Sequence, residues 1–212
     1  MLYKETVTPT TLGLLTKLMS DADLASFYLV GGTSMALQVG HRISVDLDLF
    51  TSSSFDKDFL KNHLIEYYSF LVDYEAKNTL KGEINGVLVD CIAHEYPLVQ
   101  PIIENEGLRL ASLLDIAAMK LNAISGNGTR IKDFIDVAYL SDRYSFNQML
   151  ESYCQKYKIQ NPIIPVKAIT YWEEINFNQP IKMLNNPENL WKKVSKRLLE
   201  MQKYPDKIFS LL

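Results

Sequence analysis

The chain of 212 residues has little cysteine and no long apolar run. Its two cysteines, Cys91 and Cys154, each lie inside an apolar stretch, which is the usual setting of reduced, packed thiols and not of a disulfide framework. No run of eighteen apolar residues is present, and the first residues lack the basic and then apolar pattern of a signal peptide. We therefore expect a cytoplasmic protein with no membrane partner.

Glycine and proline are also sparse, with nine and eight residues scattered singly along the chain. Together with 22% charged residues, this excludes a collagen-like, low-complexity or wholly disordered chain. The length is sufficient for one large or two small domains with a proper core.

The near-neutral total charge hides an asymmetry between the two parts of the chain. Residues 1–129 carry 9 basic and 16 acidic side chains, whereas residues 130–212 carry 13 and 9. One interpretation is an acidic part that gathers carboxylates and a basic part that faces a polyanion. The alternative is ordinary solvated helix surface.

The apolar pattern predicts an α+β fold. Strands are expected at 27–30 and 44–50, on either side of a Gly31–Gly32 turn and a short helix over 33–39. A hairpin with strands 80–84 and 87–92 is expected to turn at Asn85–Gly86. Helices are expected at 9–21, 56–71, 111–125, 130–143, 146–157, 165–174 and 188–203. We therefore predict a small mixed sheet in a core of residues 1–110 and a helical region of residues 111–212.

The strongest local signal for chemistry is the pair Asp46 and Asp48 on a predicted strand. Strand side chains alternate, so Ser44, Asp46 and Asp48 are expected to share one face. Adjacent carboxylates are tolerable where a divalent cation, most naturally Mg²⁺, lies between them. Asp90, at the end of the apolar residues 87–89, would complete a triad of metal ligands for two-metal chemistry. The alternatives are a solvated strand face for the pair and a strand-end acid for Asp90.

The Gly31–Gly32 turn lies fourteen residues before this pair and opens a helix. Backbone N–H groups of Gly32, Thr33 and Ser34 are therefore expected to cradle a phosphate at the helix N-terminus. A simple turn is the alternative.

Further along, Lys120 lies in the apolar stripe of its predicted helix, four residues from both Ile116 and Ile124. Such a lysine must either extend to solvent or meet an anion, and a triphosphate is the attractive partner. In the next helix Asp133 and Asp136 share a face, with Lys132 placed to pair with Asp136.

The three histidines have no metal-type spacing, and we assign them no catalytic role.

Five segments in order resemble the AbiEii/AbiGii toxin-type nucleotidyltransferases of the polymerase-beta-like superfamily, over roughly residues 25–142. The segments are Gly31-Gly32-Thr33-Ser34-Met35-Ala36-Leu37, Arg42-Ile43-Ser44-Val45-Asp46-Leu47-Asp48-Leu49-Phe50, Val89-Asp90, residues 114–124 around Lys120, and Lys132-Asp133-Phe134-Ile135-Asp136-Val137.

The resemblance implies a nucleotidyltransferase fold in which residues 111–142 complete the active site. It assigns catalysis to Asp46, Asp48, Asp90, Lys120 and Asp136, with the first three as Mg²⁺ ligands. It assigns nucleotide binding to Gly31, Gly32, Thr33, Ser34, Arg42, Ser44, Lys120, Lys132 and Asp133.

The function implied is transfer of a nucleotide from an NTP to an acceptor hydroxyl, with an RNA such as the 3′ end of tRNA as the acceptor. The protein would be the toxin-like component of a bacterial toxin–antitoxin or phage-abortive system, with a cognate antitoxin as partner. Basic side chains of the last predicted helix are candidates for contacting RNA: Lys192, Lys193, Lys196, Arg197 and Lys203.

Other readings remain open at this point. A D-x-D motif also marks aspartyl-nucleophile phosphatases and metal-dependent glycosyltransferases, although the preceding Gly-Gly turn fits neither well. The acceptor could be a protein or a small molecule. A catalytically silent domain that binds an NTP or a partner is a further alternative.

Overall fold

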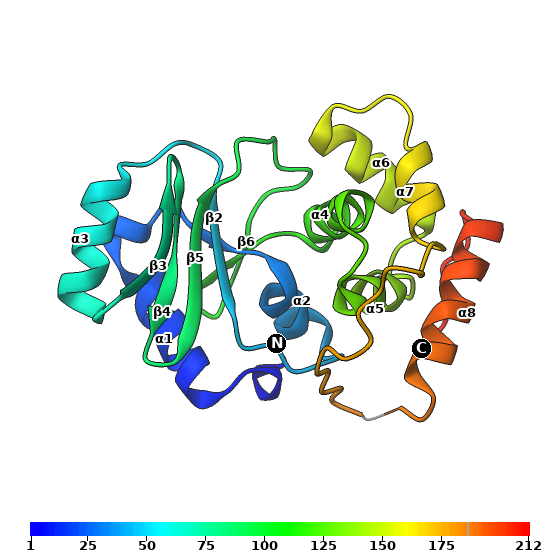
Figure 1. Ribbon diagram of the computed structural model, residues 1–212, viewed down its shortest axis with the longest axis horizontal. Coiled ribbons are helices and arrows are strands. Elements are labelled where there is room, and N and C mark those ends of the chain that lie inside the picture. The colour runs from blue at the N-terminus through cyan, green and yellow to red at the C-terminus, as the bar shows by residue number, and fades with distance from the viewer. Residues whose placement is uncertain (186) are drawn as a thin grey trace. The chain divides into compact units, whose positions relative to one another are not determined.

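The computed structural model describes residues 1–185 and 187–212 (Figure 1). The chain divides into two compact units, Met1–Ala111 and Ser112–Leu212. The first contains every strand of the sheet described below, and the second is helical.

The first unit is built on a seven-stranded mixed sheet in the order β3-β4-β5-β2-β1-β7-β6. The central strands β1 (Tyr28–Leu29) and β2 (Leu47–Thr51) are antiparallel, whereas β2 and β5 (Val87–Ala93) are parallel. The remaining strands extend the sheet to its edges: β3 (Leu71–Ala76), β4 (Thr79–Ile84), β6 (Ile103–Asn105) and β7 (Leu108–Leu110). The predicted mixed sheet is therefore confirmed.

The core of this unit lies on one face of the sheet, against α1 (Pro9–Ser20) and α3 (Lys57–Tyr68). Leu47 and Leu49 of β2 and Val89 and Cys91 of β5 are at most 1% exposed there. Burial raises the pKa of the Cys91 thiol to about 12, so this cysteine is a packing residue at neutral pH. The alternate residues of the same strands point to the opposite face.

The second unit contains α4 (Leu113–Gly126), α5 (Ile131–Leu140), α6 (Phe146–Tyr157), the short α7 (Ile163–Ala168) and α8 (Leu190–Lys203). Helix α4 packs on α5, α6 and α7, and α8 packs on α5. Ser112 caps α4 by accepting a hydrogen bond from the Asp115 N–H group, and Ser145 forms a capping box with Gln148 at the start of α6. Among the described residues, no helix is long and apolar enough to cross a membrane.

Local sequence signals explain several element boundaries. The turn between β4 and β5 has Asn85 and Gly86 at φ of 52° and 79°, the left-handed conformation that the Asn-Gly pair favours in two-residue hairpins. Helix α3 begins after the cap Asp56, as predicted, but ends at Tyr68. Ser69 adopts a left-handed conformation there, and its N–H group bonds to the carbonyls of Leu64 and Ile65, so the predicted continuation to residue 71 is wrong.

Candidate functional site

A row of three charged side chains crosses the sheet of the first unit on the face opposite the core. Asp48 of β2 is in register with Asp90 of the parallel strand β5, and Asp90 is in register with Lys81 of β4. Laterally paired residues point to the same face, so the two carboxylates and the ammonium group lie side by side. Lys81 Nζ also forms a close ion pair with Asp90 Oδ2.

The Gly31–Gly32 segment packs directly against this row, and both residues need to be glycine. Gly31 has φ of +67°, and a Cβ atom on it would lie 2.2 Å from Asp48 Oδ2. A Cβ atom on Gly32 would lie 2.3 Å from Arg42 Nη2 and 3.2 Å from Ser44 Oγ. The two glycines therefore bring the start of a helix against the carboxylate and the guanidinium group, closer than a side chain would allow.

Helix α2 begins at Gly31 and runs to Val39, so it starts two residues earlier than predicted. The N–H groups of Gly31, Gly32 and Thr33 precede the first helical hydrogen bond, which Ser34 N–H donates to the carbonyl of Val30 at 3.4 Å. The Ser34 N–H group is therefore already used within the helix, and the role of this turn toward a phosphate stays a prediction.

The hydroxyl groups of Thr33 and Ser34 are buried and hold the local structure. Thr33 Oγ1 donates to Ser44 Oγ at 2.9 Å and to the carbonyl of Asp46, whereas Ser34 Oγ accepts from Gln38 Nε2 at 3.2 Å. These bonds tie α2 to the segment before β2. Both residues are at most 1% exposed, and their predicted roles in nucleotide binding stay predictions.

Ser44 and Asp46 precede β2, which begins at Leu47. The N–H group of Ser44 donates to the carbonyl of Thr6 at 2.9 Å, and the carbonyl of Asp46 accepts from Thr33, so this segment pairs with neither adjoining strand. The predicted start of this strand at Ser44 is therefore wrong, and strand alternation does not apply to Ser44 and Asp46. Ser44 Oγ nevertheless lies against Gly32 as Asp48 Oδ2 lies against Gly31. The exposed Asp46 is instead placed by its contact with α2.

The donor set of this region fits a hard divalent cation. Asp48 and Asp90 present carboxylate oxygens from adjacent strands, and Asp46 is an exposed carboxylate two residues before Asp48. Oxygen ligands of this kind are those that Mg²⁺ prefers. The space that a side chain would take at Gly31 or Gly32 is filled by Asp48 and by Arg42 and Ser44.

The second unit contains a buried ion cluster on two helices. Lys120 Nζ of α4 lies 2.6 Å from Asp133 Oδ1 and 2.8 Å from Asp136 Oδ2 of α5. The side chains of the three residues are between 0 and 8% exposed. Asp133 Oδ2 has no hydrogen-bond partner among the described residues, and Arg130 Nε lies 3.8 Å from it.

This cluster changes the interpretation of Lys120. The Lys120 ammonium group is buried and paired with the two predicted aspartates of α5. Lys132 lies half-buried in the first turn of α5. The roles of Lys120, Lys132, Asp133 and Asp136 toward a nucleotide stay predictions.

Sequence reasoning missed a second buried ion pair in this unit. Lys156 Nζ of α6 lies 2.8 Å from Asp115 Oδ1 of α4, and both side chains are 1% exposed. Asp115 also accepts a hydrogen bond from the Ser112 hydroxyl at 2.7 Å. The partners are 41 residues apart, so no local pattern could have predicted the pair.

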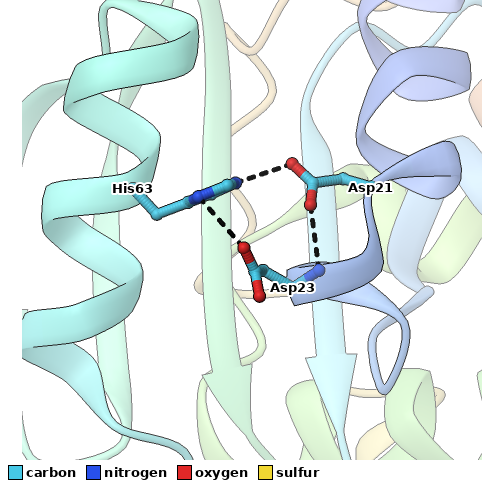
Figure 2. Close-up of side chains that lie close together, drawn as sticks. All are labelled: Asp21, Asp23 and His63. Carbon is cyan, nitrogen blue, oxygen red and sulfur yellow. Dashed lines mark hydrogen bonds and ion pairs between the residues drawn. The ribbon is translucent and has the colours of Figure 1, made fainter.

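It also missed a cluster of Asp21, Asp23 and His63 in the first unit (Figure 2). His63 Nε2 lies 2.7 Å from Asp21 Oδ2, and Nδ1 lies 3.2 Å from Asp23 Oδ2. One ligand atom from each residue lies within 4.8 Å of the others, a grouping that could hold a metal ion. The two ring nitrogens contact two different carboxylates. The cluster links α1 and α3 through side chains.

The Lys81–Asp90 pair was also missed, although the sequence contains its signal. A two-residue turn at Asn85–Gly86 places Ile84 opposite Val87, and counting outward along the two strands places Lys81 opposite Asp90.

Comparison with solved structures identifies the fold. The fold resembles a crystal structure from *H. pylori* described as a candidate nucleotidyltransferase, with a TM-score of 0.54, 17% identity, and coverage of 92% of this chain and 96% of that one. It also resembles JHP933 from *Helicobacter pylori*, with a TM-score of 0.51, 15% identity, and coverage of 93% and 94%. The architecture is therefore the predicted nucleotidyltransferase fold.

Sequence comparison identifies the family. The chain matches the family described as "Nucleotidyl transferase AbiEii toxin, Type IV TA system" over residues 13–87 and 87–206. It is also 30% identical over 166 residues to the uncharacterized protein aq_aa25 of *Aquifex aeolicus*, an alignment that covers 76% of this chain and 80% of that protein. The chain belongs to the AbiEii nucleotidyltransferase family and is a nucleotidyltransferase.

Proposed function

We propose that the protein transfers a nucleoside monophosphate from an NTP to an acceptor hydroxyl in a Mg²⁺-dependent reaction that releases pyrophosphate. The observation that carries this proposal is the packing of Gly31, at the start of α2, against the carboxylate of Asp48, which is in register with Asp90 on the neighbouring strand. A helix N-terminus attracts phosphate, and adjacent carboxylates attract a divalent cation. Their proximity matches the two charged parts of a metal–triphosphate complex.

In this proposal Asp46, Asp48 and Asp90 hold the metal, which supplies charge neutralisation and orientation at the reacting phosphate. The N–H groups of Gly31, Gly32 and Thr33 bind phosphate oxygens, and the Arg42 guanidinium group beside Gly32 adds positive charge. Ser44 positions the turn through its hydrogen bond with Thr33. The barrier is lowered mainly by positioning and electrostatic stabilisation.

We further propose that the acceptor is an RNA, with the 3′ end of tRNA as the first candidate. Support comes from the charge of the second unit, where Lys192, Lys193, Lys196 and Lys203 are all exposed on α8. Exposed lysines on one helix are suited to contacting phosphates without reading sequence. Arg197 is a poorer candidate, because it donates to Ser141 Oγ at 2.8 Å and lies 4.7 Å from the Phe209 ring centroid.

The family description supports a role as the toxin-like component of a toxin–antitoxin system, with a cognate antitoxin as partner. This role is the biological setting we propose for the transfer reaction.

The test is to incubate the full chain with Mg²⁺, bulk tRNA and each of the four α-labelled NTPs, and to resolve the products on a denaturing gel. We expect label on RNA with at least one NTP. Asp48→Asn and Asp46→Asn should lower the rate at least about 10³-fold, because each removes a charged metal ligand from the proposed site. Both variants should retain the circular dichroism spectrum of the wild type.

Three results would change the proposal in different ways. Label on protein or on a small molecule, with none on RNA, would retain nucleotidyl transfer but replace the acceptor. NTP binding that requires Mg²⁺, with no labelled product on any acceptor, would favour a binding-only protein. Normal turnover by Asp48→Asn would show that the metal site is wrongly assigned.

The RNA surface has its own test. Replacing Lys192, Lys196 and Lys203 together by alanine should reduce the slope of log binding constant against log salt concentration by about 2, which corresponds to three lost phosphate contacts on a single strand. The matched control replaces the exposed lysines Lys4, Lys17 and Lys77 of the first unit. Fluorescence anisotropy with labelled RNA from 50 to 300 mM salt measures both, and an equal change in both triple variants would contradict the α8 surface.

A further inference from the structure

The row of charged side chains on the sheet face opposite the core continues to the edge of the sheet with an aromatic residue. Tyr74 of the edge strand β3 is in register with Lys81 of β4, which is in register with Asp90 of β5. Tyr74 is 55% exposed. Laterally paired residues point to the same face, so this tyrosine ends the row that begins at Asp48.

A β-bulge turns Tyr74 to this face. The pairing of β3 with β4 shifts between Val72 and Tyr74, so β3 contains one residue more than β4 at this point. Strict alternation would place Val72 and Tyr74 on the same face, and the extra residue places them on opposite faces. The next residue, Glu75, confirms the direction, because its Oε2 lies 2.9 Å from Lys61 Nζ of α3, on the core side of the sheet. Bulges beside functional sites re-aim side chains in this way.

The order of the strands indicates from which side the acceptor approaches. Gly31 follows β1, and β1 lies on the other side of β2 from β5. The proposed reaction places the phosphates of the NTP at Gly31, beside Asp48. The attacking and leaving oxygens are in line with the reacting phosphorus, so the acceptor hydroxyl arrives from the β5 side of Asp48. The rest of the acceptor then extends over Asp90 toward Tyr74.

The chemistry at this end of the row suits a nucleobase. Bases stack on exposed aromatic rings whatever the sequence, and this contact needs no positive charge. Residues 1–129 carry 9 basic and 16 acidic side chains, so this part of the chain is poorly suited to holding an RNA by its phosphates. Tyr74 is two strands from Asp90, a separation of about 10 Å, which places its ring near the last nucleotides of an acceptor whose 3′ hydroxyl lies at the carboxylates.

We propose that Tyr74 is the platform on which a base near the 3′ end of the acceptor RNA stacks. This inference rests on the proposed function and adds a substrate-binding residue to it. Tyr74 lies away from the reacting atoms, so it acts on the affinity for the acceptor and not on the affinity for the NTP.

The test measures binding of a single-stranded RNA oligonucleotide to the full chain and does not depend on turnover. The oligonucleotide has a free 3′ hydroxyl and carries 2-aminopurine at each of its last three positions in turn. Fluorescence anisotropy gives the affinity, and quenching of 2-aminopurine reports stacking. The variants are Tyr74→Leu, Tyr74→Phe and the control Tyr67→Leu, whose tyrosine is 66% exposed on α3. Thermal unfolding confirms that they are folded.

We expect Tyr74→Leu to bind the RNA about 5- to 100-fold more weakly and to lose the quenching at one of the three positions, because a stacked base loses its partner. The slope of log binding constant against log salt concentration should not change, because no phosphate contact is removed. Binding of the NTP with Mg²⁺ should also be unchanged. Tyr74→Phe retains the ring and should behave as the wild type, as should Tyr67→Leu.

Wild-type affinity in Tyr74→Leu would overturn the inference. An equal loss in Tyr74→Phe or in Tyr67→Leu would also overturn it, because the effect would then not depend on an aromatic ring at this place. A loss of NTP binding with RNA binding intact would assign the ring to the incoming nucleotide and would count against the inference as well.

Failure of the proposed function gives a different result. If the wild type neither binds nor labels RNA, the RNA acceptor and the inference fall together. If the wild type labels RNA and Tyr74→Leu binds it equally well, only the role of Tyr74 falls.

Discussion

The two units use the same chemical groups, two aspartates and one lysine, in opposite ways. In the first unit Asp48, Asp90 and Lys81 lie in a row on a sheet face, and Asp90 and Lys81 are substantially exposed. In the second unit Lys120 joins Asp133 and Asp136 between two helices, and none of the three side chains is more than 8% exposed.

The difference lies in solvation. Exposed charges are stabilised by water, so they can exchange partners at low cost and are available to a metal ion or a substrate. Buried charges lose that hydration, and each must keep its partner to remain charged. The group of Asp48, Asp90 and Lys81 is therefore suited to binding a ligand. The group of Lys120, Asp133 and Asp136 has a structural role, whether or not it also takes part in catalysis.

The largest stability effect is expected at the buried group. Lys120→Met should lower the free energy of unfolding by about 3–5 kcal/mol, because it leaves two buried carboxylates without their shared cation. Urea denaturation followed by circular dichroism measures this change. A loss of activity in this variant is informative only when the protein remains folded under the assay conditions.

The matched variant in the first unit is Lys81→Met, for which the same measurement should show a change of less than about 1 kcal/mol. Similar losses of stability in both variants would contradict the comparison, since burial would then not distinguish the two groups. Both variants remove the same ammonium group from beside a carboxylate, so a difference between their losses of stability measures the effect of burial.

The sequence predicted the elements whose signals are local. The strand, Gly31–Gly32 turn and helix before β2 were found, as was the Asn85–Gly86 hairpin. Strand β3 was missed because Leu71 to Glu75 are exposed at every position and lack the alternation of a half-covered strand. A register shift between Val72 and Tyr74 weakens its pattern further.

The sequence predicted which residues belong to the candidate site, but not how all of them are arranged in space. The Asp48–Asp90 neighbourhood follows from strand pairing, whereas the departure of Ser44 and Asp46 from the strand depends on hydrogen bonds to Thr6 and Thr33. Such bonds join segments that only the tertiary structure brings together. The same reason explains why the contact between Asp21 and His63, 42 residues apart, was missed.

The cluster of Asp21, Asp23 and His63 is intermediate between the two groups, both in burial and in its expected effect on stability. Burial alone would raise the pKa of Asp21, but hydrogen bonds from Tyr68 at 2.6 Å and His63 at 2.7 Å outweigh it and hold this pKa below its ordinary value. The same contact raises the pKa of Tyr68, for which burial is the larger cause. Asp21→Asn should therefore cost about 1–2 kcal/mol of stability at pH 7, where Asp21 is charged in the folded and unfolded chains.

The sign of the pH dependence follows from the lowered pKa. A carboxyl group with a depressed folded-state pKa stabilises the fold above its unfolded-state pKa, and this contribution is lost as pH falls through the folded-state value. The stability difference between the wild type and Asp21→Asn should thus shrink as the pH falls below about 4. Urea titrations at pH 3, 4, 5 and 7 measure it, with Asp23→Asn as control, because the Asp23 side chain is 43% exposed and should contribute less. A difference that grows toward low pH would show that Asp21 is held in its neutral form, and the cluster would then belong with neither of the two charged groups.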